Sequence, residues 1–120
     1  MGVNQFLDLL NTNDLGPIDQ ERCAKAVFQG SIDPTDTVRL LDVIDNLDKF
    51  TDPVSQRYMA WSVLDKKFGE NESVLMALAK KCDIFTDETA KKYIAIADKQ
   101  GQFGTNPEVT NILKNTGVFV

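Results

Sequence analysis

Apolar residues recur at helical spacing along most of this chain. Near the N-terminus the i, i+3, i+4, i+7 pattern of an amphipathic helix is carried by Val3, Phe6, Leu7 and Leu10. Similar spacing returns in six later segments, and no segment shows the sustained period of two that is typical of a half-buried strand. The pattern therefore predicts an all-helical protein with helices at about 3–10, 18–28, 34–49, 53–68, 72–81, 87–100 and 107–116.

Three of these helices are expected to begin at the same kind of signal. Asp33-Pro34, Asp52-Pro53 and Asn106-Pro107 each place a capping side chain directly before a proline. Asp and Asn accept a hydrogen bond from an unpaired N–H at the helix start, and proline at the first helical position loses no bond. Short, sharply delimited helices follow from this arrangement.

The inner faces are expected to follow the longest apolar stripes. For the 34–49 helix that stripe is Val38, Leu41, Ile44 and Leu47, widened by Leu40 and Val43. The 53–68 helix carries its bulkiest side chains on one face, which is predicted to form the centre of the core, because aromatic rings bury the most area. That face comprises Val54, Tyr58, Trp61, Leu64 and Phe68.

The fold class favoured by this pattern is a compact, irregular (orthogonal) bundle of six to seven short helices, forming one domain over residues 1–120. The alternative is a short array of helical hairpins, since alternate helix starts lie 34 to 38 residues apart. Evenly spaced helices in any small bundle give similar intervals. The interval alone therefore leaves both arrangements open.

Composition narrows the class of protein. The chain is 42% hydrophobic and 26% charged, which suits one folded core and not disorder. No apolar run approaches the ~18 residues needed to span a bilayer, so no membrane partner is expected. Cys23 and Cys82 fall in apolar helical positions and are interpreted as reduced core thiols of a cytoplasmic protein.

Catalytic chemistry has little support in the sequence. The chain contains no histidine, which removes Ser-His and Cys-His nucleophile pairs and most zinc sites. It also lacks a glycine-rich phosphate loop and an EF-hand calcium loop. We therefore expect a protein that is not an enzyme, with no catalytic, cofactor-binding or metal-binding residues.

Charge is unevenly distributed within a net charge of −5. Residues 1–52 hold ten acids and four bases, and the most regular acidic positions are Asp42, Asp45 and Asp48. These acids are a candidate docking face for a basic partner. The alternative is a solvated outer face, partly neutralised by Arg39 and Lys49 at i, i+3 and i, i+4 spacing.

The second half carries three lysine pairs, which are Lys66-Lys67, Lys80-Lys81 and Lys91-Lys92. If the fold gathers them, they are a candidate phosphate-binding patch for nucleic acid. The first two pairs also lie in the last turns of predicted helices, where cations complement the helix dipole.

Two apolar features complete the candidate surfaces. Phe103 lies in a loop between Gly101 and Gly104, where an aromatic ring is either an exposed anchor or a plug in the core. The C-terminal Val118, Phe119 and Val120 are expected to be buried, on their own domain or against a partner, because exposure would forgo roughly 1.5–3 kcal/mol per side chain.

These observations predict a protein-interaction or assembly module that binds another protein or its own copies. Its candidate contacts are Asp42, Asp45, Asp48, Phe103, Val118, Phe119 and Val120. The alternative is a nucleic-acid-associated helical protein that uses the lysine pairs.

Overall fold

The computed structural model describes residues 3–12 and 15–115, and these residues form seven α-helices and two 3₁₀ turns with no strand. The prediction of an all-helical fold is confirmed. The helices are α1 (Val3–Leu10), α2 (Pro17–Phe28), α3 (Thr37–Asp45), α4 (Pro53–Leu64), α5 (Glu72–Lys81), α6 (Glu88–Lys99) and α7 (Pro107–Asn115). The 3₁₀ turns, Leu47–Lys49 and Cys82–Ile84, follow α3 and α5.

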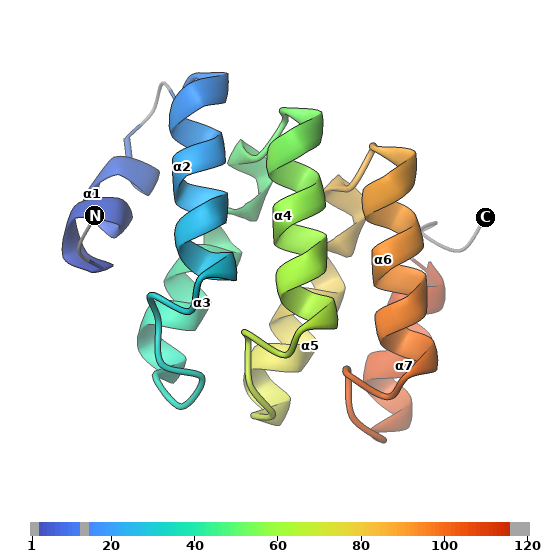
Figure 1. Ribbon diagram of the computed structural model, residues 1–120. Helices are drawn as coiled ribbons and strands as arrows, with labels where there is room; N and C mark the ends of the chain where they lie inside the picture. The colour runs from blue at the N-terminus through green and yellow to red at the C-terminus, as the bar shows by residue number, and fades with distance from the viewer. Residues whose placement is uncertain (1–2, 13–14, 116–120) are drawn as a thin grey trace.

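The helices pack in two layers within a bundle of 35 × 29 × 21 Å. Helices α2, α4 and α6 lie side by side in one layer, and α3, α5 and α7 lie behind them (Figure 1). Successive hairpins, α2–α3, α4–α5 and α6–α7, therefore stack next to one another. The helical bundle is as predicted, and its internal order is the one that the hairpin alternative describes.

Equivalent hydrogen bonds repeat at the ends of the three front helices. The residue two positions beyond each helix has a positive φ, at Gly30 (81°), Lys66 (58°) and Gly101 (80°). Each donates its N–H to a carbonyl three residues earlier, and the next residue donates to one five residues earlier. This pattern satisfies the free carbonyls of a helix end. Lys66 thus occupies a backbone conformation that the other two hairpins assign to glycine.

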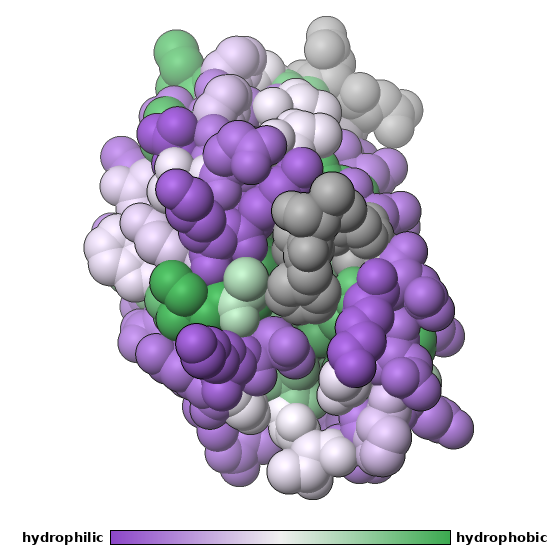
Figure 2. Space-filling model, turned by 90° about the vertical axis from the view of Figure 1, so that its right-hand side faces the viewer, coloured by the Kyte–Doolittle hydropathy of each residue, from purple (hydrophilic) through white to green (hydrophobic). Residues whose placement is uncertain are grey.

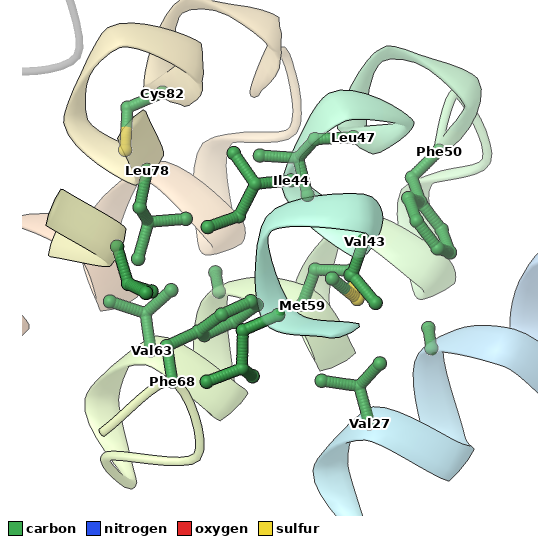
Figure 3. Close-up of a cluster of buried hydrophobic side chains, with 14 of the residues drawn as sticks. Val27, Val43, Ile44, Leu47, Phe50, Met59, Val63, Phe68, Leu78 and Cys82 are labelled. Carbon is green, nitrogen blue, oxygen red and sulfur yellow. The ribbon is translucent and has the colours of Figure 1, made fainter. Parts of the chain in front are cut away.

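The core lies between the two layers and is continuous across the hairpins. Figure 3 shows Val27 of α2, Ile44 of α3 and Met59 of α4 converging on it. Three loop residues at equivalent positions after the front helices also fill it, since Ile32, Phe68 and Phe103 are each at most 3% exposed.

The predicted inner face of the 53–68 segment is wrong at Val54 and Trp61, whereas its last member, Phe68, is buried as predicted. The side chain expected at the centre of the core, Trp61, is 44% exposed, and Val54 is 38% exposed. Helix α4 is covered on both sides by α2 and α6, and close approach of helices favours small side chains at the contacts. The buried positions of α4 are accordingly Ser55, Gln56, Met59, Ala60, Ser62 and Val63.

The predicted start of α3 is also wrong, and its predicted inner stripe is wrong in part. Asp33 does not begin the helix, because its carboxylate closes a turn by accepting hydrogen bonds from the backbone and hydroxyl of Thr35. The helix begins at Thr37, where Asp36 is the N-cap. The predicted inner stripe holds at Ile44 and Leu47, which are buried together with the flanking Leu40 and Val43. It is wrong at Val38, which is 77% exposed. The other two predicted starts, at Pro53 and Pro107, are confirmed.

On one side of the molecule, the surface is largely polar, as expected of the exterior of a helical bundle. On the side made by α6 and α7, Figure 2 shows mainly hydrophilic side chains, with apolar groups in small areas between them. Among the described helices, none is long and apolar enough to cross a membrane.

Candidate functional site

An aromatic row crosses the outer side of the front layer. Phe28 of α2 packs on Trp61 of α4 with ring centroids 4.6 Å apart, and its ring is 5.8 Å from that of Tyr58. On the other side, Trp61 lies 6.0 Å from Tyr93 of α6. The row thus joins all three front helices, with the most exposed ring at its middle. We call Phe28, Val54, Tyr58, Trp61 and Tyr93 the aromatic face.

A shallow hollow lies in this face between α4 and α6. Its volume is about 200 Å³, and it is lined by Val54, Arg57, Tyr58, Trp61 and Tyr93. Pockets that enclose a drug-sized ligand usually measure roughly 300–1,000 Å³. The hollow is therefore better matched to a side chain of a partner than to a separate small molecule.

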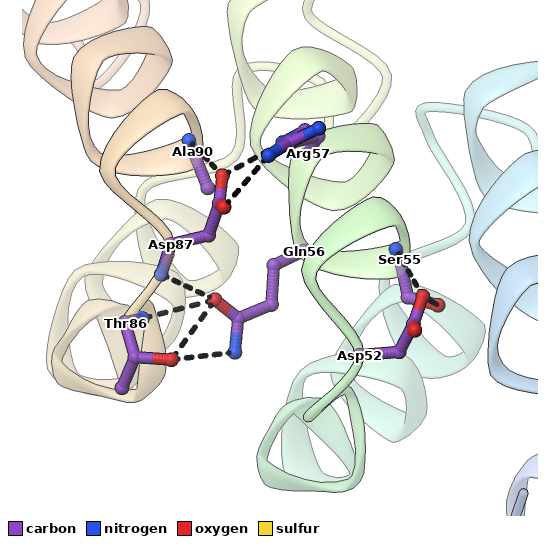
Figure 4. Close-up of polar contacts among 7 residues, drawn as sticks. All are labelled: Asp52, Ser55, Gln56, Arg57, Thr86, Asp87 and Ala90. Carbon is purple, nitrogen blue, oxygen red and sulfur yellow. Dashed lines mark hydrogen bonds and ion pairs between the residues drawn. The ribbon is translucent and has the colours of Figure 1, made fainter. Parts of the chain in front are cut away.

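An ion pair fixes the wall of the hollow. Arg57 Nε and Nη2 donate to the two carboxylate oxygens of Asp87 at 2.9 and 3.1 Å, as drawn in Figure 4. The hydrogen bond from Arg57 lowers the pKa of Asp87, and Asp87 in turn raises the pKa of Arg57. Since the pKa of Asp87 is lower in the folded state, the pair stabilises the fold at neutral pH and is lost as acid protonates the carboxylate.

Buried glutamines hold the front helices in register. Gln56 of α4 accepts hydrogen bonds from the backbone N–H groups of Thr86 and Asp87, both at 2.9 Å, at the start of α6 (Figure 4). Its amide nitrogen donates to the carbonyl of Phe50 at 3.0 Å. Both ends of this buried side chain are therefore satisfied, and α6 is tied to α4 beside the aromatic face.

Gln20 makes the same contacts one hairpin earlier. It accepts from the N–H groups of Thr51 and Asp52 at 2.9 and 2.8 Å, and donates to the carbonyl of Leu15 at 2.9 Å. The equivalent position in the third hairpin is Lys91, whose ammonium lies 3.7 Å from Glu88. Two equivalent sets of glutamine hydrogen bonds, one between α2 and α4 and one between α4 and α6, therefore connect the helices that carry the aromatic face.

The predicted acidic residues lie on and just after α3. Asp45 and Asp48 are exposed, and Asp42 accepts a hydrogen bond from the Asn11 side chain at 3.2 Å. The predicted neutralising cations have other partners. Arg39 pairs with Asp36 at 2.7 Å, and the Lys49 ammonium donates to the carbonyls of Leu10, at the end of α1, and of Thr12.

The lysine pairs do not gather in one place. Lys66 and Lys67 follow α4, whereas Lys80 and Lys81 end the adjoining α5. A helix of ten residues is about 15 Å long. A ligand that contacted all three pairs would have to extend along the bundle. Three of the lysines already have acidic partners, which are Glu70 for Lys66 at 2.7 Å, Asp65 for Lys67 at 3.4 Å and Glu88 for Lys91 at 3.7 Å.

The apolar candidates have different outcomes. Phe103 is 2% exposed and belongs to the core, so the expectation of an exposed anchor at this ring is wrong and the core-plug alternative is right. The glycines on either side supply the two turns that fold the ring inward. The residues Val118, Phe119 and Val120 lie outside the described part of the chain.

Other groups offer little chemistry. Burial raises the pKa of the Cys23 thiol to about 11 and raises that of Cys82 further, so both stay protonated at neutral pH. Within residues 3–12 and 15–115, no group of acids and cysteines could hold a metal ion. A larger hollow of about 480 Å³ lies between two loops, but its charged walls, Lys66 and Glu70, already pair with each other.

The sequence contained a signal for the aromatic face that helical periodicity does not detect. Phe-Thr-Asp occurs at 50–52 and again at 85–87, and in both copies a tyrosine follows the aspartate by six residues. These tyrosines are Tyr58 and Tyr93. The repeat therefore marks both the linked helix starts and two rings of the aromatic face.

Comparison with known proteins adds no further assignment: no protein-family model, no curated protein and no solved structure matches the chain.

Proposed function

We propose that this chain is a non-enzymatic protein-interaction module that binds its partner through the aromatic face. The observation that carries the proposal is the position of Trp61, which is 44% exposed at the middle of a row of rings from three helices. Burying an aromatic ring that is already held by its neighbours gains apolar area with little loss of conformational freedom.

The composition of this face supports binding to a protein. Residues that dominate binding energy at protein interfaces are enriched in Trp, Tyr and Arg, and they cluster around a central pocket. Here Trp61, Tyr58, Tyr93 and Arg57 surround one hollow. By contrast, the acids Asp45 and Asp48 are solvated, and exposed charges of this kind mainly affect association rate.

Replacing Trp61 tests the proposal against a matched surface change. Trp61→Ser is expected to weaken partner binding by at least about 2 kcal/mol, or roughly thirtyfold in Kd, as for a central aromatic residue at an interface. Val38→Ser is the control, because Val38 is an exposed apolar residue on α3 in the back layer. The measurement is quantitative affinity capture from a lysate of the source organism, followed by titration of any captured protein.

The expected result is a protein that wild type and Val38→Ser retain equally and Trp61→Ser loses. Thermal melting of both variants checks that the fold is intact. A partner that Trp61→Ser retains in full, or that Val38→Ser loses, would contradict the proposal.

A further inference from the structure

The charges around the aromatic face are opposite to those of the chain as a whole. The exposed charged side chains of α2, α4 and α6 are five cations, Arg22, Lys25, Arg57, Lys92 and Lys99, and one acid, Glu88. Asp65, just after α4, is also exposed, and the half-buried charges on these helices are Asp19, Glu21, Lys91 and Asp98. The whole chain has 13 basic and 18 acidic residues, so this side is locally basic on an acidic protein.

Most of the acids on this side are engaged, and several of the cations are not. Asp65 lies 3.4 Å from Lys67, and Glu88 lies 3.7 Å from Lys91. Among the described residues, no ion pair involves Lys25, Lys92 or Lys99. The free positive charges therefore flank the rings, from α2 on one side and from α6 on the other.

Resting on the proposed function, we propose that the occupant of the aromatic face is an acidic segment of a partner protein. Its central large apolar side chain enters the hollow beside Trp61, and its carboxylates meet Lys25 and Lys92. The basic flanks supply the charge complementarity, and the rings supply the apolar contact.

The geometry sets the length of that segment. Neighbouring packed helices have axes roughly 8–10 Å apart, so the flanks on α2 and α6 are separated by about 20 Å. A strand-like segment covers this distance in about six residues at ~3.3 Å each. A helical segment needs about thirteen residues at ~1.5 Å each.

The ring geometry favours a protein segment over single-stranded nucleic acid. The planes of the rings are tilted by 39° to 53° and pack against one another, which leaves few free faces for bases to stack on. The Lys25 ammonium lies over the Tyr58 ring, 5.7 Å from its centre, so this cation occupies a ring face on which a base would otherwise stack.

A selection from random peptides tests this inference without a known partner. The full chain is immobilised and exposed to a displayed library of unbiased sequence. Peptides that bind wild type but not Trp61→Ser are then sequenced and synthesised. We expect these peptides to be acidic and to contain a large apolar residue. Their affinity should fall about tenfold in Lys25→Glu/Lys92→Glu and should decrease as salt is raised.

The control is the charge reversal Lys80→Glu/Lys114→Glu, at exposed lysines of α5 and α7 in the back layer, which should change the affinity by less than twofold. Neutral or basic peptides that depend on Trp61 would overturn the acidic partner but leave the proposed function standing. The absence of any Trp61-dependent peptide would count against the proposed function itself.

Two further outcomes would overturn the acidic segment and assign the aromatic face to a different ligand. Tighter binding of a labelled oligothymidylate than of any selected peptide, lost in Lys25→Glu/Lys92→Glu, would assign the face to single-stranded nucleic acid. A mass in light scattering that rises with concentration for wild type, but not for Trp61→Ser, would assign it to a second copy of this chain.

Discussion

Replacing Gln56 with leucine is expected to lower the free energy of unfolding by about 3 kcal/mol. Leucine is close in size but cannot accept the N–H groups of Thr86 and Asp87, or donate to the carbonyl of Phe50. A buried donor or acceptor left without its partner costs about 1–3 kcal/mol. The loss should therefore exceed that of an ordinary surface change several times over, and urea titration of both proteins measures it.

The matched control is Gln100→Leu. Gln100 is an exposed glutamine just beyond α6, and a surface substitution usually changes stability by less than about 0.5 kcal/mol. Because Gln20 makes the equivalent link between α2 and α4, Gln20→Leu should resemble Gln56→Leu. A loss below about 1 kcal/mol in Gln56→Leu would show that the link between α4 and α6 contributes little.

Replacing Gly69 with alanine is the second change with a large expected effect. Gly69 has φ of +75°, and a Cβ at this position would lie 2.3 Å from the carbonyl oxygen of Pro34. The left-handed backbone costs a non-glycine residue roughly 1–2 kcal/mol, and the backbone clash adds to that cost. We expect Gly69→Ala to lower the free energy of unfolding by about 3 kcal/mol or more.

Gly101→Ala separates the two causes. Gly101 has nearly the same φ, +80°, but a Cβ there would have no atom within 4 Å. Its expected loss is therefore the backbone cost alone, about 1–2 kcal/mol. Equal losses for the two variants in thermal or urea unfolding would contradict the close contact between the loops at Pro34 and Gly69.

The number and type of helices could be predicted from the sequence because the signals for them are local. Asp52 and Asn106 cap helices that begin at the prolines after them. Asp33-Pro34 presents the same two residue types, yet the Asp33 carboxylate accepts from both the backbone N–H and the hydroxyl of Thr35, and the result is a turn. The helix instead begins at the next cap, Asp36.

The inward face of a helix could not be predicted in the same way, because it depends on which neighbours cover it. In α4, aromatic residues and small residues form two stripes, and both have helical spacing. Size favoured the aromatic stripe for the core, but contact with helices on both sides requires small residues such as Ala60 and Ser62. Side-chain size therefore predicts a buried Trp61, whereas in the structure Trp61 is the most exposed ring of the aromatic face.

The hydrogen bonds that Gln20 and Gln56 make between hairpins could not be predicted for a different reason. Gln20 and Gln56 are ordinary polar residues in the sequence, and their roles depend on backbone groups 31 positions further along the chain. Besides the similar interval between alternate helix starts, the recurrence of Phe-Thr-Asp after 35 residues indicates that the helix starts are equivalent. A search for short repeated motifs detects such equivalence where hydrophobic periodicity does not.

Site-specific photo-crosslinking in the source organism tests most directly whether the aromatic face is where this protein meets a partner. A photoreactive phenylalanine analogue is placed at position 61 in one variant and at position 38 in another, since both sites are exposed but lie on different layers. We expect irradiation to attach a discrete partner protein at position 61 and not at position 38. Crosslinking that is equal at the two positions, or confined to position 38, would contradict the account.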